Sequence, residues 1–413
     1  MSACPRLPLC AVLLIASVPS WAANKVDLDY HVRFLPERDQ AEVRLTLEQG
    51  SAVRSLRFDL GDQGRYSDFQ ADGQWQQEEP GSGVWRPAEG KSSLSYRVRV
   101  NHARASSGRF DARMTGNWAL LRGDDLVPSA HLDQQDGVEL VARLEFELPE
   151  GWTGVETGWP RIGRNRFRID NPARRFDRPT GWLLAGQLGT RRAILGGSEV
   201  SVAAPLGEGV RRMDILTLLT FVWDEYRTVF LRAPGKLLVV GAGNPMWRGG
   251  LSAPNSLYLH ADRPLVSENG TSPLLHELVH VFARIRDTDA SDWISEGLAE
   301  YYAIELLRRA GGLAEDRYER IYRQLEHWSR EVGSLRGERI SGPVTARAVL
   351  LLRALDAEIR ARSENRHSLD DVVHGLIRME RVNTDDFVAL SENLMGGESR
   401  VLDTPLLAPG AGR

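Results

Sequence analysis

The stretch 271–302, TSPLLHELVHVFARIRDTDASDWISEGLAEYY, constrains the fold more than any other part of the chain. Two histidines, His276 and His280, stand four residues apart, and Glu277 directly follows the first. On a helix this spacing places both imidazoles one turn apart on the same face. Zinc binds imidazole nitrogens and carboxylate oxygens, and a reactive zinc site leaves one of its four positions to water. The stretch therefore predicts a helix that supplies two ligands to one zinc ion and needs a third from elsewhere.

Local signals support this helix. Ser272 is a good N-cap, and Pro273 falls at the first helical position, where its missing N–H costs nothing. Apolar residues then recur at helical spacing and predict a buried face. These residues are Leu274, Leu275, Leu278, Val279 and Phe282.

A second helix is expected to begin near Ser291 or Asp292 and to end at the glycine pair 311–312. It carries Glu296 and Glu300, which are four residues apart and therefore share one side of the helix. One carboxylate can bind the metal while the other accepts a hydrogen bond from the second N–H of a ligand histidine. The spacing alone leaves open which glutamate takes which role.

The pattern H-E-x-x-H followed by W-x-S-E-G-x-x-x-Y-Y resembles the gluzincin metallopeptidases. It is most similar to the glycyl-aminopeptidase family, which has a thermolysin-like catalytic domain. The resemblance implies one zinc ion held by His276, His280 and Glu296, with Glu300 as the residue that orients a ligand histidine or as the alternative ligand. It also implies hydrolysis of peptide bonds, with Glu277 as the general base that takes a proton from water and passes it to the leaving amine.

The region 24–205 has the pattern of a β-sandwich. Apolar residues alternate with polar ones in several short runs that turn-forming residues separate, which is typical of strands. These runs include 26–34, 43–47, 94–100, 140–148 and 166–170. The stretches 144–152 and 169–186 also resemble the β domain of the same family. A β-sandwich followed by a mainly α thermolysin-like domain is therefore the predicted fold class.

The region 206–400 is predicted to form the second domain. Helices are expected at 210–231, 315–332 and 346–362, and a buried strand at 236–240. Ser368, with Asp371 three residues later, predicts a capping box, and Thr384 begins a short helix. Family members often carry a PDZ domain after this point, and none is expected here. Residues 401–413 are predicted to be a disordered tail.

The family resemblance also implies a substrate-binding strand before the zinc helix, where a glutamate after a glycine holds the free α-amine of the substrate. This chain reads Gly249-Gly250-Leu251-Ser252, so uncharged Ser252 stands at the matching position. Gly250 and Ser252 are candidate substrate contacts. The other interpretation of the two glycines is a plain turn.

Stabilisation of the tetrahedral intermediate is a separate question. The related family carries a tyrosine in its C-terminal helices for this purpose, whereas the matching segment here reads 344–348, VTARA. Losing one such donor can cost roughly 10²–10³ in rate. Arg347 could substitute, Tyr318 or Tyr322 could reach in from the preceding helix, or zinc alone could serve.

The first 23 residues resemble a secretory signal. Arg6 precedes an apolar run at 7–18, and small residues stand at 20 and 22, where a signal peptidase cleaves. The run is too short to span a bilayer comfortably. Cleavage would remove Cys4 and Cys10, the two cysteines of the sequence, so neither could serve as ligand or nucleophile. An exported, periplasmic or secreted protein without a stable membrane anchor is expected.

The charge composition argues against nucleic acid as a binding partner. The formal net charge is −4, which provides no electrostatic footprint for nucleic acid. The first hypothesis is an exported zinc metallopeptidase acting on peptides or proteins, either from a free amino end or internally. The second is a non-catalytic pseudo-peptidase that keeps the zinc fold and acts in binding or scaffolding. The missing tyrosine and Ser252 motivate this alternative.

Overall fold

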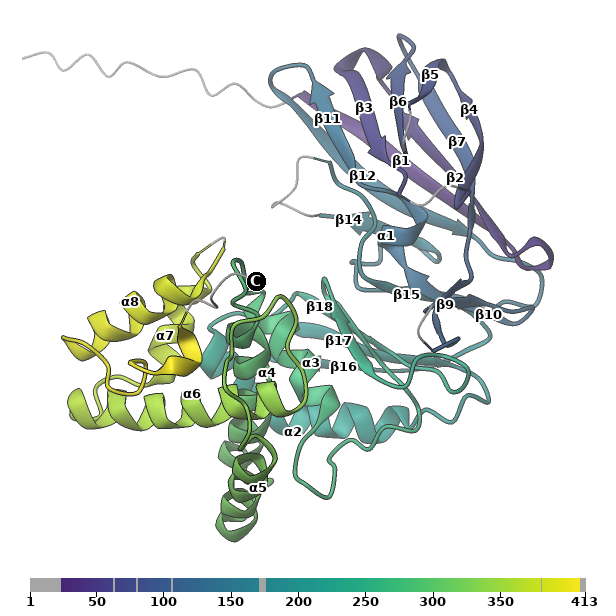
Figure 1. Ribbon diagram of the computed structural model, residues 1–413. Coiled ribbons are helices and arrows are strands. Elements are labelled where there is room, and N and C mark those ends of the chain that lie inside the picture. Colours follow the sequence, from purple (N-terminus) through teal and green to yellow (C-terminus); the bar gives the residue numbers. More distant parts are fainter. Residues whose placement is uncertain are drawn as a thin grey trace, which may run out of the picture.

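The computed structural model describes residues 24–408 except 62–63, 79–80, 105–106, 171–175 and 380. Strands dominate the first half of the chain and helices the second (Figure 1). The predicted signal segment 1–23 lies outside the described residues. No helix in the described part of the chain combines the length and apolar character that crossing a bilayer requires.

A six-stranded sheet forms one layer of the N-terminal region, in the order β14-β12-β1-β2-β7-β4. Strand β1 pairs in parallel with β12 and antiparallel with β2. Alternate side chains of β1 are buried, from Val26 to Phe34, as the period of two predicts. The strands are β1 (Asn24–Leu35), β2 (Gln40–Leu47), β4 (Tyr66–Ala71), β7 (Ser92–Arg99), β12 (Val138–Glu147) and β14 (Arg166–Ile169).

A four-stranded sheet packs against the first, in the order β11-β3-β6-β5. Phe176 lies between the two layers, because its ring contacts both Tyr30 of β1 and Phe58 of β3. Both sheets contribute to one apolar core. The strands are β3 (Val53–Asp59), β5 (Gly73–Glu78), β6 (Ser82–Pro87) and β11 (Ala130–Gln134).

A five-stranded sheet, in the order β13-β15-β10-β9-β8, connects the N-terminal layers to the rest of the chain. Its residues Trp118 and Trp182 share a buried cluster with Leu238 and Tyr258 of the next sheet. The short helix α1 (Gly123–Leu126) follows β10. The strands are β8 (His102–Ala103), β9 (Phe110–Met114), β10 (Trp118–Arg122), β13 (Gly154–Thr157) and β15 (Trp182–Gly186).

The fourth sheet also has five strands, in the order β16-β17-β18-β20-β19. Strand β17 pairs in parallel with β18, so the sheet continues across the expected domain boundary at residue 205. Three of its five strands, β18, β19 and β20, lie in the region 206–400, so this region contains part of a sheet as well as helices. The strands are β16 (Leu188–Leu195), β17 (Ser198–Pro205), β18 (Lys236–Val240), β19 (Gly250–Ala253) and β20 (Ser256–Leu259).

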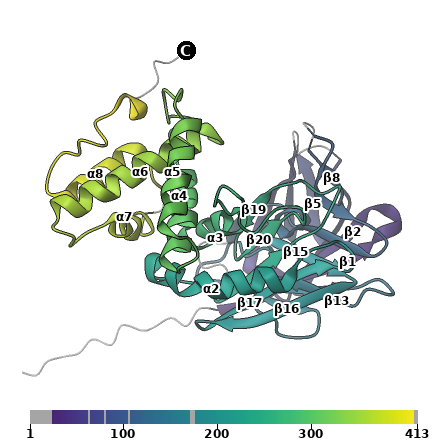
Figure 2. The ribbon, with the colours of Figure 1, turned by 90° about the horizontal axis from the view of Figure 1, so that it is seen from below.

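Seven helices of the described chain follow α1, close to their predicted positions. Helices α6, α7 and α8 lie on one side of α3 and α4, and most of the strands lie on the other (Figure 2). The expected helix at 315–332 ends earlier, at Trp328, and the one at 346–362 begins earlier, at Pro343. The helices are α2 (Arg212–Phe230), α3 (Pro273–Ala283), α4 (Trp293–Arg309), α5 (Glu315–Trp328), α6 (Pro343–Arg362), α7 (Leu369–Leu376) and α8 (Thr384–Met395).

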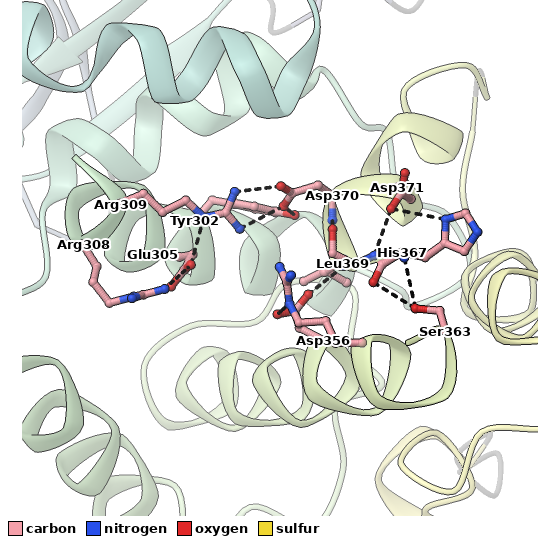
Figure 3. A network of polar contacts seen from close by, with 12 residues as sticks. Tyr302, Glu305, Arg308, Arg309, Asp356, Ser363, His367, Leu369, Asp370 and Asp371 are labelled. Carbon is pink, nitrogen blue, oxygen red and sulfur yellow. Dashed lines mark hydrogen bonds and ion pairs between the residues drawn. The ribbon is translucent and has the colours of Figure 1, made fainter. Parts of the chain in front are cut away.

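A buried ionic network ties α4 to α7 (Figure 3). Arg309 donates to the Asp370 carboxylate at 2.7 Å, and the Tyr302 hydroxyl donates to the same carboxylate at 2.9 Å. Glu305 accepts from Arg308 at 2.8 Å and from Arg309 at 2.9 Å. The predicted capping box at the start of α7 is confirmed. This network holds the C-terminal helices against the helix that carries Glu296.

The predicted disordered tail is wrong for residues 401–408. Leu402 is 6% exposed and Leu407 is 7% exposed, and both join the main helical core. A short 3₁₀ turn, Pro405–Leu407, holds the second of them in place. Burial of these apolar side chains outweighs the entropic cost of ordering the segment. Composition alone does not reveal that the side chains are buried. Residues 409–413 lie outside the described residues.

Candidate metal centre

Helix α3 begins where the sequence predicts. The Ser272 hydroxyl accepts a hydrogen bond from the backbone N–H of Leu275 at 3.2 Å, and Pro273 occupies the first turn. The apolar face packs into the main core, and the buried Tyr226 hydroxyl of α2 donates to the Leu275 carbonyl at 2.8 Å. With this face buried against α2, the histidine-bearing face turns toward α4.

The two histidines converge as predicted. The Nε2 atoms of His276 and His280 lie 3.2 Å apart. Glu296 lies in the first turn of α4, with its Oε2 atom 3.4 Å from Nε2 of His276 and its Oε1 atom 3.4 Å from Nε2 of His280. Ligand atoms bound about 2.0–2.2 Å from a tetrahedral zinc lie roughly 3.3–3.6 Å apart. The donor atoms of these three residues all lie within 4.8 Å of one another, so their type and spacing fit one zinc ion.

Glu300 contacts the opposite side of the first histidine. One of its carboxylate oxygens lies 3.0 Å from Nδ1 of His276, whereas Glu296 faces the Nε2 atoms. A carboxylate on the outer nitrogen fixes the tautomer that leaves Nε2 free to bind a metal. The geometry therefore favours Glu296 as the third ligand and Glu300 as its support, as the family resemblance implies.

The charges of this cluster are strongly coupled. Burial alone would lower the pKa of His276, but its contacts with Glu296 and Glu300 raise it to about 10. Burial alone would raise the pKa of Glu296, but the two histidines lower it well below its ordinary value. The contacts among these side chains therefore favour the charged forms of His276 and Glu296 despite their partial burial.

Glu277 is not one of the three residues that supply donor atoms, and its side chain contacts strand β19. Its carboxylate accepts a hydrogen bond from the backbone N–H of Ser252 at 2.7 Å. Gly250 faces the same side chain closely, because a Cβ built at Gly250 would lie 2.8 Å from Cγ of Glu277. Gly250 and Ser252 thus lie beside Glu277, and the segment is a strand at the edge of the fourth sheet rather than a plain turn.

The tyrosines proposed for the intermediate lie elsewhere. The Tyr318 hydroxyl is buried and donates to Glu305 at 3.0 Å, more than two helical turns beyond Glu296 on α4. Tyr322 is 2% exposed and stacks beneath the Arg353 guanidinium. Core packing directs both rings toward the interface of α4, α5 and α6, so these contacts do not support a role at the site, and the role suggested for either hydroxyl stays a prediction.

Arg347 has a different environment. It is half-buried near the start of α6, and within the described part of the chain no hydrogen bond or ion pair engages its guanidinium. Its neighbour Ala348 packs against Gly297, the residue after Glu296. The role suggested for Arg347 stays a prediction.

Sequence reasoning missed one carboxylate at the centre. Asp287 lies in the loop between α3 and α4 and accepts a hydrogen bond from the hydroxyl of Ser295, which precedes Glu296. A loop residue follows no helical or strand period, so pattern analysis has no means of selecting it.

The fold and the site together define the class: the chain has the fold of the M1 zinc metallopeptidases. The predicted gluzincin-type fold is confirmed. An aminopeptidase N family protein from Idiomarina loihiensis matches with a TM-score of 0.64 and 17% identity over 85% of this chain and 70% of that one. An M1 zinc metallopeptidase mutant from Deinococcus radiodurans, bound to a Tyr-Ser-Ala substrate, matches with a TM-score of 0.59 and 18% identity over 95% of each chain. No family model and no curated protein matches the sequence.

Proposed function

We propose that this protein is a zinc-dependent peptidase that holds one zinc ion through His276, His280 and Glu296. The observation that carries the proposal is the convergence of two imidazole Nε2 atoms and one carboxylate within 4.8 Å. When bound, zinc supplies a water of lowered pKa and polarises the scissile carbonyl. The structural relatives support the same chemistry, because the Deinococcus radiodurans protein is a zinc metallopeptidase whose mutant binds a Tyr-Ser-Ala substrate.

Glu277 is the proposed general base. Its carboxylate lies beside the ligands without joining them, and the backbone N–H of Ser252 holds it at 2.7 Å. This hydrogen bond fixes one oxygen, so the carboxylate keeps one orientation while it takes a proton from water. It then delivers that proton to the leaving amine.

We propose further that the enzyme cleaves internal peptide bonds. Recognition of a free α-amine requires a carboxylate that is available to an ammonium group. Among the described residues, the three glutamates at the site already have partners: Glu296 faces both histidines, Glu300 contacts His276, and Glu277 accepts from Ser252. The unpaired Oδ1 atom of Asp287 is shielded from solvent, so it is not open to an ammonium group. Ser252 itself carries no charge.

A peptide-library digest with mass-spectrometric readout tests both proposals. Wild type with added zinc is expected to cleave free and N-acetylated peptides alike, and a chelator or Glu277→Gln is expected to abolish cleavage. Cleavage restricted to peptides with a free amine would establish an aminopeptidase instead. Cleavage that persists in Glu277→Gln at the wild-type rate would exclude Glu277 as the base.

The alternative is a pseudo-peptidase that binds zinc without catalysis. The observation that favours it is the burial of Tyr318 and Tyr322 away from the cluster. Stoichiometric zinc without cleavage of any library peptide would support this alternative. A wild-type protein that binds no zinc would exclude both functions.

A further inference from the structure

The two histidines of the cluster differ in how their outer nitrogens are supported. Nδ1 of His276 contacts Glu300 at 3.0 Å, whereas within the described residues no group accepts a hydrogen bond from Nδ1 of His280. A histidine that binds metal through Nε2 carries its proton on Nδ1, and that N–H almost always donates to a carboxylate, a carbonyl or water. His280 therefore requires an acceptor when the ion is present.

One carboxylate oxygen of Asp287 has no hydrogen-bond donor among the described residues. Its Oδ2 atom accepts from the Ser295 hydroxyl, but its Oδ1 atom is shielded from solvent and has no hydrogen-bond partner. Burial raises the pKa of Asp287 to about 6, although the hydrogen bond from Ser295 opposes this shift. Ser295 directly precedes Glu296, whose carboxylate lies 3.4 Å from Nε2 of His280, so Asp287 contacts the residue next to a ligand candidate. An unpaired buried carboxylate oxygen costs free energy, so the presence of such an oxygen in the loop between the two ligand helices indicates a role at this site.

The backbone around Asp287 is held in place by a distant segment. Asp287 forms a parallel β-bridge with Val382, which precedes α8. The flanking hydrogen bonds run from Thr288 N–H to the Val382 carbonyl at 3.0 Å and from Val382 N–H to the Arg286 carbonyl at 2.9 Å. The carboxylate is thus presented from a fixed backbone, although it lies in a loop.

We propose that Asp287 is a positioning residue for the metal centre, with its Oδ1 atom accepting the Nδ1–H of His280 when zinc is bound. Through Ser295 the same carboxylate also braces the turn that carries Glu296. Asp287 would thus orient the His280 ring, as Glu300 orients the His276 ring. The inference rests on the proposed zinc site, but it concerns a residue that does not touch the ion.

The test is the zinc dissociation constant, measured by competition with a chromophoric chelator. Asp287→Ala is expected to weaken zinc binding about 10–100-fold. Asp287→Asn, whose amide oxygen can still accept a hydrogen bond, is expected to restore part of the affinity. Asp289→Asn removes the same charge from an exposed position of the same loop and is expected to bind zinc within about twofold of wild type. Equal affinity of Asp287→Ala and wild type would overturn the proposal.

A measurement on the wild type covers the case in which Asp287→Ala fails to fold. In zinc-loaded protein labelled with ¹⁵N-histidine, the Nδ1–H of His280 is expected to give a signal protected from solvent exchange. Free exchange of that proton would overturn the proposal whatever the variants do. A wild-type protein that binds no zinc would overturn the proposed function and this inference together, whereas normal zinc binding with an unprotected His280 would overturn this inference alone.

Discussion

Nδ1 of His276 lies 3.0 Å from a carboxylate oxygen of Glu300, which comes from a different helix and stands 24 residues away in the sequence. The contact fixes the His276 ring so that Nε2 points at the same centre as Nε2 of His280. This contact therefore helps to bring side chains of α3 and α4 together in one site.

Removing that contact is expected to weaken metal binding. Glu300→Ala leaves the His276 ring without its acceptor, so the zinc dissociation constant should rise about 10–100-fold. Glu300→Gln retains an oxygen that can accept the Nδ1–H and should lose less. Competition with a chelator measures both constants. Unchanged affinity in Glu300→Ala would contradict the support role.

Gly250→Ala is expected to reduce catalysis without reducing zinc binding. The new Cβ would lie 2.8 Å from Cγ of Glu277, so the base must shift away from its hydrogen bond with Ser252. A misplacement of about 1 Å can cost on the order of 10²-fold in rate. Steady-state kinetics with a cleaved peptide measures kcat, and chelator competition measures zinc.

Gly235→Ala is the matched control for that substitution. Gly235 precedes β18 in the same sheet, and a Cβ there meets nothing within 4 Å. Its kcat is expected to equal that of wild type. If Gly250→Ala also retains the wild-type kcat, Glu277 tolerates the shift and the strand does not position it.

Gly297→Val is expected to destabilise the protein by about 1–3 kcal/mol through overpacking. Gly297 follows Glu296, and even a Cβ at this position would lie 2.9 Å from Cβ of Ala348 and 3.1 Å from a Leu352 methyl. Denaturant unfolding measures the loss. Gly333→Ala, where an added Cβ meets nothing within 4 Å, serves as control. A stability equal to wild type would mean that α4 and α6 separate at little cost.

The Glu305 network is expected to make stability fall in acid. Burial alone would raise the pKa of Glu305, but hydrogen bonds from Arg308 and Arg309 lower it below its ordinary value of 4.5. A carboxylate with a lowered folded-state pKa contributes stability above its unfolded pKa and loses it as pH falls through the folded value. The free energy of unfolding should therefore decrease below about pH 5.

Glu305→Gln separates this effect from general acid denaturation. The variant removes the charge that Arg308 and Arg309 contact but keeps an oxygen that can accept a hydrogen bond, so it should lose about 1–3 kcal/mol at neutral pH. Its free energy of unfolding should also fall less steeply with acid than that of wild type. Parallel pH profiles for the two proteins would show that another carboxylate governs the acid sensitivity.

The sequence by itself determined the local features of the site. The cap at Ser272, the spacing of His276 and His280 and the buried face of α3 follow from helix geometry, which acts over neighbouring residues. The same holds for the alternating strand β1 and the capping box at Ser368. These predictions are confirmed because each depends on residues only a few positions apart.

Tertiary structure decided the contacts between distant residues. Only the packing of α3 on α4 determines that Glu296 meets both Nε2 atoms while Glu300 meets Nδ1 of His276. Core packing likewise directs Tyr318 to Glu305, and the loop that bridges to Val382 brings Asp287 to Ser295, the neighbour of Glu296. The physical reason is that these outcomes depend on which helix faces bury against one another, and local periodicity does not specify a partner.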